Sequence, residues 1–372
     1  MSVRKREWES GGESKSAWIV DYVDGEGHRH IKTFAKQKDA NEYRDTVGVN
    51  IRAGVHSNSK LTVAEAAAAW VKRVEADGAE RTTIDQYRQH VELHIVPQIG
   101  RTKLSELTPQ SVERLRDNLL KNLESRSMAR KVLTSFKSLL KAAKHAHVAG
   151  DVSIKRSPRD KRPLEVGRDI PTPGEVKRTI AAAQDERRRA LLLVAALTGL
   201  RASELRGLRW ADVNLKGGEL HVRQRADRYK KIGPTKSKAA IRTIPLAPDV
   251  LTALKTWKLA CPKGEADLVF PTASGQIEHH KNMLASLQPI LKAAGVVDKA
   301  GRPKYALHAF RHFFASWCIN RKVDGGRELP AKVVQYLLGH SSIVITLDLY
   351  GHMFPRGDDQ TELAEAARAL LA

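Results

Sequence analysis

The sequence predicts a multidomain, mainly α-helical protein with a small α+β unit at its N-terminus and a small antiparallel sheet in its largest domain. Its 372 residues suffice for two or three domains with buried cores. Strand-like alternation occurs near the N-terminus and again around residues 219–246, and helical spacing dominates elsewhere. Polar or proline-containing breaks separate the parts. We predict the boundaries as residues 1–56, 61–150, a linker at 151–171, 172–356 and a tail at 357–372.

The composition points to a polyanionic partner. Lys and Arg number 64 against 42 Asp and Glu, a net charge of +22, which favours nucleic acid first and an anionic membrane second. A generic basic enzyme is the plain alternative. Two cysteines without a CxxC pattern predict no disulfide framework. The longest apolar run, Ala190–Leu197, is too short to cross a bilayer, and the basic start MSVRKREWES lacks the apolar segment of a secretory signal. We expect a cytoplasmic protein.

The first part of the chain predicts three strands and one helix. Trp18, Val20 and Tyr22 alternate with other residues, as in a strand with one buried face. Turn signals place the remaining elements. These are a strand at Arg4–Glu9 before a Gly11-Gly12 turn, a turn at Asp24–Gly27, a strand at His28–Phe34, a helix at Lys36–Arg52 and a polar linker at 56–60.

Residues 61–150 predict only helices. Thr62 can cap a helix that runs through Asp77, with Glu65 completing a capping box. A second helix runs from about residue 82 to 94, and a loop broken by Pro97 and Gly100 follows. Thr108-Pro109 begins a third helix, since proline suits the first helical position. A fourth spans about residues 127–148.

The fourth helix predicts a basic face. At three- and four-residue spacing it carries Arg130, Thr134, Lys137, Lys141 and Lys144. Another face is apolar and should be core: Leu133, Phe136, Leu140 and Ala143. A basic stripe opposite an apolar one suits a helix along a DNA backbone, and an ordinary solvated face is the alternative.

The large domain begins at Thr172-Pro173-Gly174-Glu175, a helix start. Strands at Glu219–Arg225 and Ile241–Leu246 predict its sheet. Further helices are expected at 249–259, 278–294, 307–321 and 331–338. Residues 361–371 predict a short amphipathic tail helix, with Leu363, Ala367 and Leu370 on one face.

Three boxes in this domain carry residues suited to chemistry on a phosphate: LTGLRASELRGLRW, LHAFRHFFAS and LLGHSSIVITLDLYGHM. Guanidinium groups can grip two phosphate oxygens through a planar fork. A tyrosine is a possible nucleophile once its proton is removed. In order, the boxes supply Arg201, His308, Arg311, His340 and Tyr350. This set resembles the tyrosine recombinase family, also called the phage integrase family.

The resemblance implies roles for these residues. Arg201 and Arg311 would share the phosphate charge, with Glu204 orienting Arg201. His308 would donate to a phosphate oxygen or manage the nucleophile's proton, and His340 would donate a further hydrogen bond. Lys236, with Lys238 as the alternative, would be the general acid that protonates the leaving 5′ oxygen. Tyr350 would attack the phosphodiester and form a 3′-phosphotyrosyl link, and His352 is a less certain neighbour.

The resemblance also implies an architecture and partners. It predicts an arm-type DNA-binding domain at 1–56, a SAM-like helical core-binding domain at 61–150 and a catalytic domain of the DNA breaking-rejoining enzyme fold at 172–356. The partners would be double-stranded DNA at core and arm-type attachment sites, further copies in a homotetramer on that DNA, and DNA-bending and excisionase accessory proteins. No membrane partner is expected. The protein is expected to be associated with the nucleoid of a bacterial host. The tail helix would dock on a neighbouring protomer or on its own domain.

We therefore expect a site-specific recombinase that integrates, and also excises, a phage or mobile element without a cofactor. A non-catalytic DNA-binding regulator and a type IB topoisomerase-like relaxation activity are the alternatives. A zinc site is a competing interpretation of His308 and His312, which have the spacing of HExxH histidines. Ala309 stands where that motif has its glutamate, and no third ligand is evident, so we expect no metal.

Overall fold

A computed structural model describes residues 1–10, 13–23, 27, 29–52, 61–156, 162–355 and 360–372. The chain divides into two units, Met1–Lys161 and Arg162–Ala372. The Gly11-Gly12 turn, residues 24–26 and 28, and the linker at 56–60 lie outside the described residues. No helix in the described ranges combines the length and apolar character needed to cross a membrane.

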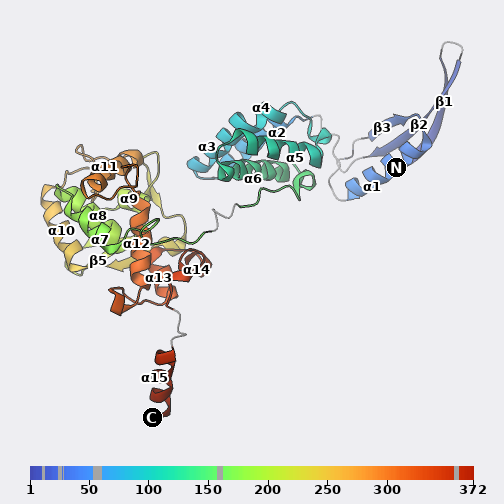
Figure 1. Ribbon diagram of the computed structural model, residues 1–372. Coiled ribbons are helices and arrows are strands. Elements are labelled where there is room, and N and C mark those ends of the chain that lie inside the picture. Colours follow the sequence, from blue (N-terminus) through green and yellow to red (C-terminus); the bar gives the residue numbers. More distant parts are fainter. Residues whose placement is uncertain (11–12, 24–26, 28, 53–60, 157–161, 356–359) are drawn as a thin grey trace. The chain divides into compact units, whose positions relative to one another are not determined.

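The N-terminal part has the three strands and the helix that the sequence predicts (Figure 1). The strands pair antiparallel in the order β1-β2-β3, with Trp18 opposite Phe34. Val20, Tyr22, Ala40 and Val47 form a small core between sheet and helix. The elements are β1 Ser2–Ser10, β2 Glu13–Val23, β3 Arg29–Phe34 and α1 Gln37–Arg52.

The helices predicted for residues 61–150 are present and run as far as Ala149. Thr62 and Thr108 cap their helices through capping boxes, the first with Glu65 and the second with Ser111. Phe136 and Leu140 of α6 lie in the core. The elements are α2 Val63–Ala76, α3 Arg81–His90, the π-helix η1 Val91–Ile95, α4 Val96–Ile99, the 3₁₀ helix η2 Leu104–Glu106, α5 Pro109–Asn122, α6 Arg126–Ala142 and the 3₁₀ helix η3 Ala146–Ala149.

Two predictions in this region are wrong. The second helix does not give way to a loop at His94, because the π-helical turn η1 lets it continue through Pro97 to Ile99. Pro97 stands in the first turn of α4, directly after the π-helical turn, where the hydrogen-bond pattern of the helix changes. The fourth helix ends at Ala142, and Lys144 follows it in the left-handed region with φ of 61°. Lys144 therefore does not continue the basic face of α6.

The second unit is mainly helical with short antiparallel strands. Helix α8 begins with four charged residues, but from Ala190 to Thr198 it is apolar and almost entirely buried, and it packs against α7, α10 and α12. The elements of the second unit are α7 Pro173–Ala181, α8 Glu186–Thr198, α9 Ala202–Gly207, η5 Trp210–Asp212, β4 Val213–Asn214, β5 Glu219–Val222, β6 Gln224–Ala226, β7 Ile232–Pro234, η6 Lys238–Ala240, β8 Arg242–Pro245, α10 Pro248–Ala260, α11 His280–Ala293, α12 Leu307–Ile319, η7 Lys322–Asp324, α13 Ala331–Leu338, α14 Ile343–Tyr350, η8 Gly351–Met353 and α15 Gln360–Leu371.

The predicted sheet is present as β4-β5-β8, and a second hairpin, β6-β7, was not foreseen. Both described ends of the predicted linker are folded. Val152 and Ile154 are buried in the helical core of the first unit, and Ile170 is buried in the core of the second. The predicted domain boundaries remain a prediction.

Candidate active site

Arg201, the first of the predicted site residues along the chain, is positioned by the turn between α8 and α9. Gly199 ends α8 with φ of 63°, and a Cβ atom there would lie 2.4 Å from Phe314. Arg201 then caps α9: its backbone N–H donates to Glu204 Oε2 at 2.9 Å, and its Nη1 donates to Oε1 at 2.8 Å. Glu204 thus orients the arginine by bonding both its backbone and its side chain.

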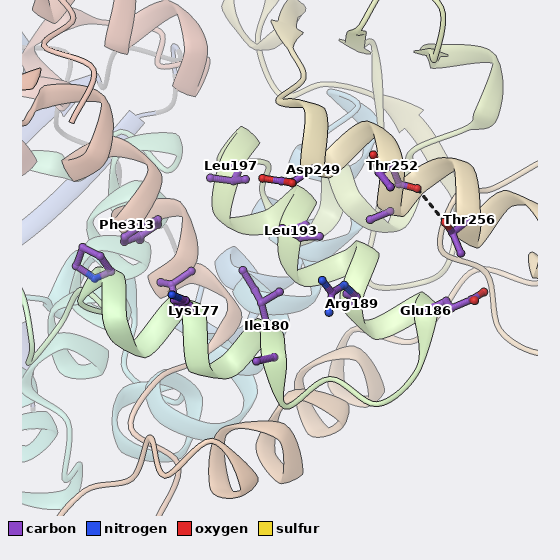
Figure 2. A pocket seen from close by; sticks show the side chains of 14 residues that line it. Lys177, Ile180, Glu186, Arg189, Leu193, Leu197, Asp249, Thr252, Thr256 and Phe313 are labelled. Atoms are coloured by element: carbon purple, nitrogen blue, oxygen red, sulfur yellow. Dashed lines mark hydrogen bonds between the residues drawn. The ribbon is translucent and has the colours of Figure 1, made fainter. Parts of the chain in front are cut away.

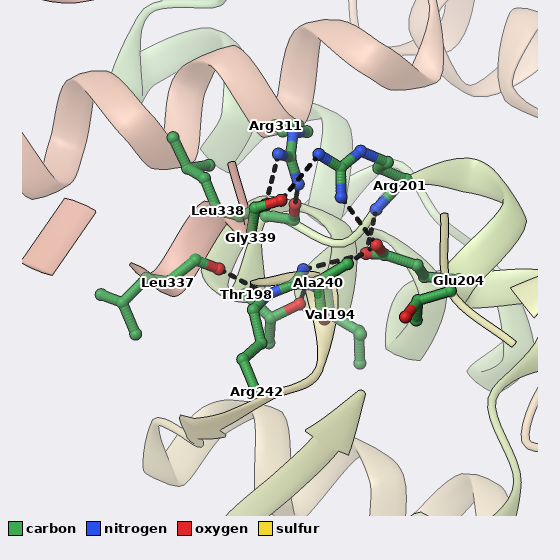
Figure 3. A network of polar contacts seen from close by, with 12 residues as sticks. Val194, Thr198, Arg201, Glu204, Ala240, Arg242, Arg311, Leu337, Leu338 and Gly339 are labelled. Carbon is green, nitrogen blue, oxygen red and sulfur yellow. Dashed lines mark hydrogen bonds and ion pairs between the residues drawn. The ribbon is translucent and has the colours of Figure 1, made fainter. Parts of the chain in front are cut away.

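Glu204 has a second, fully buried partner that the sequence analysis missed. Arg242 of β8 donates from Nη2 to Glu204 Oε2 at 2.9 Å, and its side chain is 0% exposed against 3% for the glutamate (Figure 3). Burial raises the pKa of Glu204, but the guanidinium of Arg242, followed by those of Arg201 and Arg311, outweighs it and lowers the pKa to about 2. The carboxylate is therefore ionised at neutral pH.

The C-terminal end of α13 binds all three arginines. Arg242 Nε donates to the Leu337 carbonyl at 2.7 Å, Arg311 Nη2 donates to the Leu338 carbonyl, and Arg201 Nη2 donates to the Gly339 carbonyl at 3.2 Å (Figure 3). Carbonyls at a helix C-terminus lack intrahelical partners and carry partial negative charge. The carbonyls at this helix end thus hold three arginine side chains close together, and Glu204 is the carboxylate that these contacts supplement.

Arg311 of α12 is buried, with 3% of its surface exposed. Its Nη1 donates to the Gly199 carbonyl at 2.6 Å. Burial and then the charge of Arg201 lower its pKa to about 9, which still leaves it a cation at neutral pH. His308 lies one turn earlier on the same helix. Its burial, followed by the positive charges of Arg311 and Arg201, lowers the pKa of its imidazole, which is therefore neutral.

His340 follows the α13 terminus. Its Nδ1 lies 2.9 Å from the hydroxyl of Thr346, a fully buried residue of α14, so a ligand would be bound through Nε2. Burial, followed by the charges of Arg311 and Arg201, lowers the pKa of His340 to about 3. The ring is a neutral donor or acceptor with a fixed orientation.

Tyr350 is the last residue of α14 and is 1% exposed. Its Oη lies 2.7 Å from His312 Nδ1, a contact that the sequence analysis did not predict. Burial raises the pKa of Tyr350 to about 12 against the opposing effect of Arg311 and Arg201. Burial, His308 and Arg311 lower the pKa of His312 to about 4. The position of His312, one turn after His308, was the available signal for this contact.

The six predicted residues line one pocket of about 390 Å³. Lys236 lies on the loop after β7 and reaches this pocket with Thr235 and Ser237, while Lys238 begins the 3₁₀ helix η6 and is not among the lining residues. His352 bonds the Leu164 carbonyl instead, at 2.8 Å. Among the described residues, no group of three or more potential metal ligands is placed to hold an ion.

A larger cavity of about 770 Å³ lies elsewhere in the same unit, with lining residues from α7, α8 and α10 (Figure 2). Its lining combines apolar side chains such as Ile180, Leu193 and Phe313 with the charged Lys177 and Arg189. None of the predicted site residues borders it. The residues suited to phosphate chemistry are therefore concentrated in the smaller pocket.

The predicted DNA face lies in the other unit. Arg130, Lys137 and Lys141 are on α6, and Lys141 is exposed. Lys137 Nζ donates to the Gly150 carbonyl at 3.0 Å, and the Thr134 hydroxyl donates to the Arg130 carbonyl at 2.8 Å. Contact of this face with DNA stays a prediction.

The chain is similar to known recombinases and integrases. A tyrosine recombinase XerC-like protein of Caldanaerobacter subterraneus subsp. tengcongensis is 32% identical over 49% of this chain and 50% of its own, so the chain spans about half of that relative. An integrase of Streptomyces ambofaciens is 26% identical over 94% of both chains. The solved structure of the Tn1549 transposon integrase, in complex with a circular intermediate DNA, has a TM-score of 0.65 and 19% identity over 83% of this chain and 100% of the other. Residues 172–356 match the phage integrase family, to which the chain belongs.

Proposed function

We propose that this chain is a tyrosine-type site-specific DNA recombinase that cleaves and rejoins strands through a 3′-phosphotyrosyl intermediate. The observation that carries the proposal is the convergence in one pocket of Arg201, Lys236, Arg311 and Tyr350 with two neutral histidines. These side chains come from distant parts of the sequence and combine phosphate-binding cations with a nucleophile. Such a combination has the parts that phosphodiester transesterification requires.

In the proposed reaction, the guanidinium groups of Arg201 and Arg311 bind the non-bridging oxygens of the scissile phosphate. Tyr350 Oη attacks phosphorus, and the bond from phosphorus to the 5′ oxygen breaks. Lys236 gives its proton to that leaving oxygen. A 5′ hydroxyl of a partner strand later attacks the phosphotyrosyl bond, so the bond energy is conserved and no nucleotide cofactor is consumed.

The arginines are held in a way that suits this role. Arg201 and Arg311 bond neutral carbonyls at the end of α13 and after α8, so those contacts fix the side chains without neutralising them. The one carboxylate in the network, Glu204, is shared with the buried Arg242. Excess positive charge is therefore left for an anionic ligand.

The partners of the reaction follow from charge and from the relatives. The net charge of +22 favours DNA. Solved relatives include the Tn1549 transposon integrase with a circular intermediate DNA and a lambda integrase tetramer bound to a Holliday junction. We propose that this chain likewise acts on double-stranded DNA as a tetramer and integrates a mobile element. Leu363 and Leu370 of α15 are 67% and 84% exposed, which supports a tail that contacts a neighbouring copy.

Covalent trapping tests the proposal. Nicked DNA that carries the attachment core is incubated with wild type, Tyr350→Phe and Tyr336→Phe, and products are separated on a denaturing gel. Tyr336 is a matched control because it is a tyrosine of the same unit whose hydroxyl bonds only the Thr243 amide in the described contacts. We expect a covalent band with wild type and with Tyr336→Phe only.

Two results would contradict the proposal. One is a covalent band from Tyr350→Phe. The other is no band from wild type although it binds the same DNA in a native gel, which would favour a non-catalytic regulator. Exchange between two labelled duplexes then separates recombination from relaxation, since relaxation needs no partner duplex.

A further inference from the structure

We propose that His312 is the general base that removes the phenol proton of Tyr350 during strand cleavage, a role that deepens the proposed recombinase function and rests on it. The sequence boxes assign no role to this residue. His312 is on α12, and its Nδ1 lies 2.7 Å from Tyr350 Oη, within reach for direct proton transfer. In the described part of the chain, this is the hydrogen bond that Oη makes.

The surroundings of Tyr350 favour His312 as the acceptor of its proton. The side chain is 1% exposed, so bulk water does not reach the phenol freely. His308 contacts His312 rather than the tyrosine: the two rings meet edge to face, with centroids 4.7 Å apart and an interplanar angle of 84°. His308 is thereby placed beside the phosphate-binding arginines, and His312 beside the nucleophile.

The proposed step conserves atoms and charge. In the reactive tautomer His312 carries its proton on Nε2, and its Nδ1 lone pair accepts the hydrogen bond from Oη. As the bond from Oη to phosphorus forms, the phenol proton passes to Nδ1 and gives an imidazolium. The electron pair of the broken bond goes to the 5′ oxygen, which receives the proton of Lys236. Rejoining runs the same transfers in reverse, and His312 returns the proton to Tyr350.

The charged groups around His312 make its ability to accept a proton depend on bound DNA. Two of these groups, His308 and Arg311, lie on α12 and lower the pKa of His312. Asp169, in the segment before α7, raises that pKa. Tyr350 contacts His312 from α14. Without DNA the pKa of His312 is about 4 and that of Tyr350 about 12, so the phenol keeps its proton. The scissile phosphate brings a negative charge, and the pentacoordinate transition state brings more, which stabilises the imidazolium. The nucleophile is therefore activated only when a phosphate occupies the pocket.

Single-turnover cleavage of nicked DNA tests the role. His312→Asn keeps an acceptor near the position of Nδ1 but cannot take up a proton. His221→Asn is the matched control, because His221 Nδ1 also lies beside a hydroxyl, that of Thr243 at 2.9 Å, and the residue does not border the pocket. We expect His312→Asn to bind DNA like wild type and to cleave about 10²–10⁴-fold more slowly. Its rate should rise continuously with pH up to about pH 9, because hydroxide replaces the lost base.

A second substrate separates action on the phenol from action on the phosphate. DNA with a 3′ p-nitrophenyl phosphate end can be joined to a 5′ hydroxyl strand without the tyrosine. In a Tyr350→Phe background, His312→Asn should join this substrate at an unchanged rate, whereas Arg311→Lys should slow joining strongly.

The outcomes distinguish this inference from the proposed function. If His312→Asn cleaves within about threefold of wild type over the whole pH range, the base is another group and only this inference falls. Equal losses in cleavage and in joining would mean that His312 serves the phosphate, and would overturn it as well. If wild type forms no covalent complex with DNA that it binds, the proposed recombinase function itself fails.

Discussion

The buried ion pair between Glu204 and Arg242 gives the sharpest prediction. Glu204→Gln removes the negative charge with little change of shape. It leaves Arg242, whose side chain is 0% exposed, without a counter-charge, and it releases Arg201 from the contact that orients it. We therefore expect loss of both stability and strand cleavage.

Two estimates of the loss in stability agree. Breaking a buried ion pair by removing one partner costs about 3–5 kcal/mol. Independently, the pKa of Glu204 falls from 4.5 to about 2 on folding. That difference corresponds to about 3 kcal/mol of free energy of unfolding. Because the folded-state pKa is depressed, this stability is present above about pH 4.5 and is lost as the pH falls towards 2.

Hydrogen exchange at increasing urea, read by mass spectrometry in residues 186–207, measures the effect in the full chain. Asp324→Asn is the control, since its pair with Arg321 is exposed, at 54% and 45%, and should contribute at most about 1 kcal/mol. The difference between wild type and Glu204→Gln should shrink as the pH is lowered from about 5 to about 2. A loss at neutral pH no larger than that of the control, or one that is independent of pH, would refute the reasoning.

Three further outcomes are expected. Gly339→Ala should lose more stability than Gly295→Ala in a thermal melt. Both glycines have positive φ, 63° and 65°, but only at Gly339 would the added Cβ lie 2.9 Å from the Arg242 guanidinium. Equal losses would contradict this. Thr346→Val should slow cleavage about fivefold to tenfold, because one hydrogen bond that orients a pocket histidine is lost, and an unchanged rate would show that the bond is dispensable. Lys141→Gln should reduce the slope of log affinity against log salt by about one if this exposed lysine contacts a phosphate, and an unchanged slope would exclude that contact.

Local signals in the sequence predicted most of the helices. The capping boxes at Thr62 and Thr172 define their helix starts, because both partners lie three residues apart in the chain. The hairpin β6-β7 carried no comparable signal. Its turn places Lys230 at φ of 61°, a conformation usually marked by glycine or asparagine, so the turn rule does not detect it.

Within the site, the sequence boxes named the residues but not the contacts that hold them. Arg242 bonds Glu204 across 38 positions and Leu337 across 95. No periodicity or spacing rule reaches over such separations, because the contacts exist only once β8 packs beside α13. The bond between His312 and Tyr350 likewise depends on where α12 and α14 meet.

The way the pocket holds its cations explains how charge can be concentrated there at a tolerable cost in stability. Buried guanidinium groups need hydrogen-bond acceptors, and full carboxylate partners for all of them would cancel the field that attracts a phosphate. Here the end of α13 supplies three carbonyls, each carrying only partial charge, and Glu204 supplies the one full negative charge of the network. The remaining charge is positive, and an incoming phosphodiester can balance it. Binding and activation are then coupled, because the same phosphate that completes this balance also makes protonation of His312 favourable.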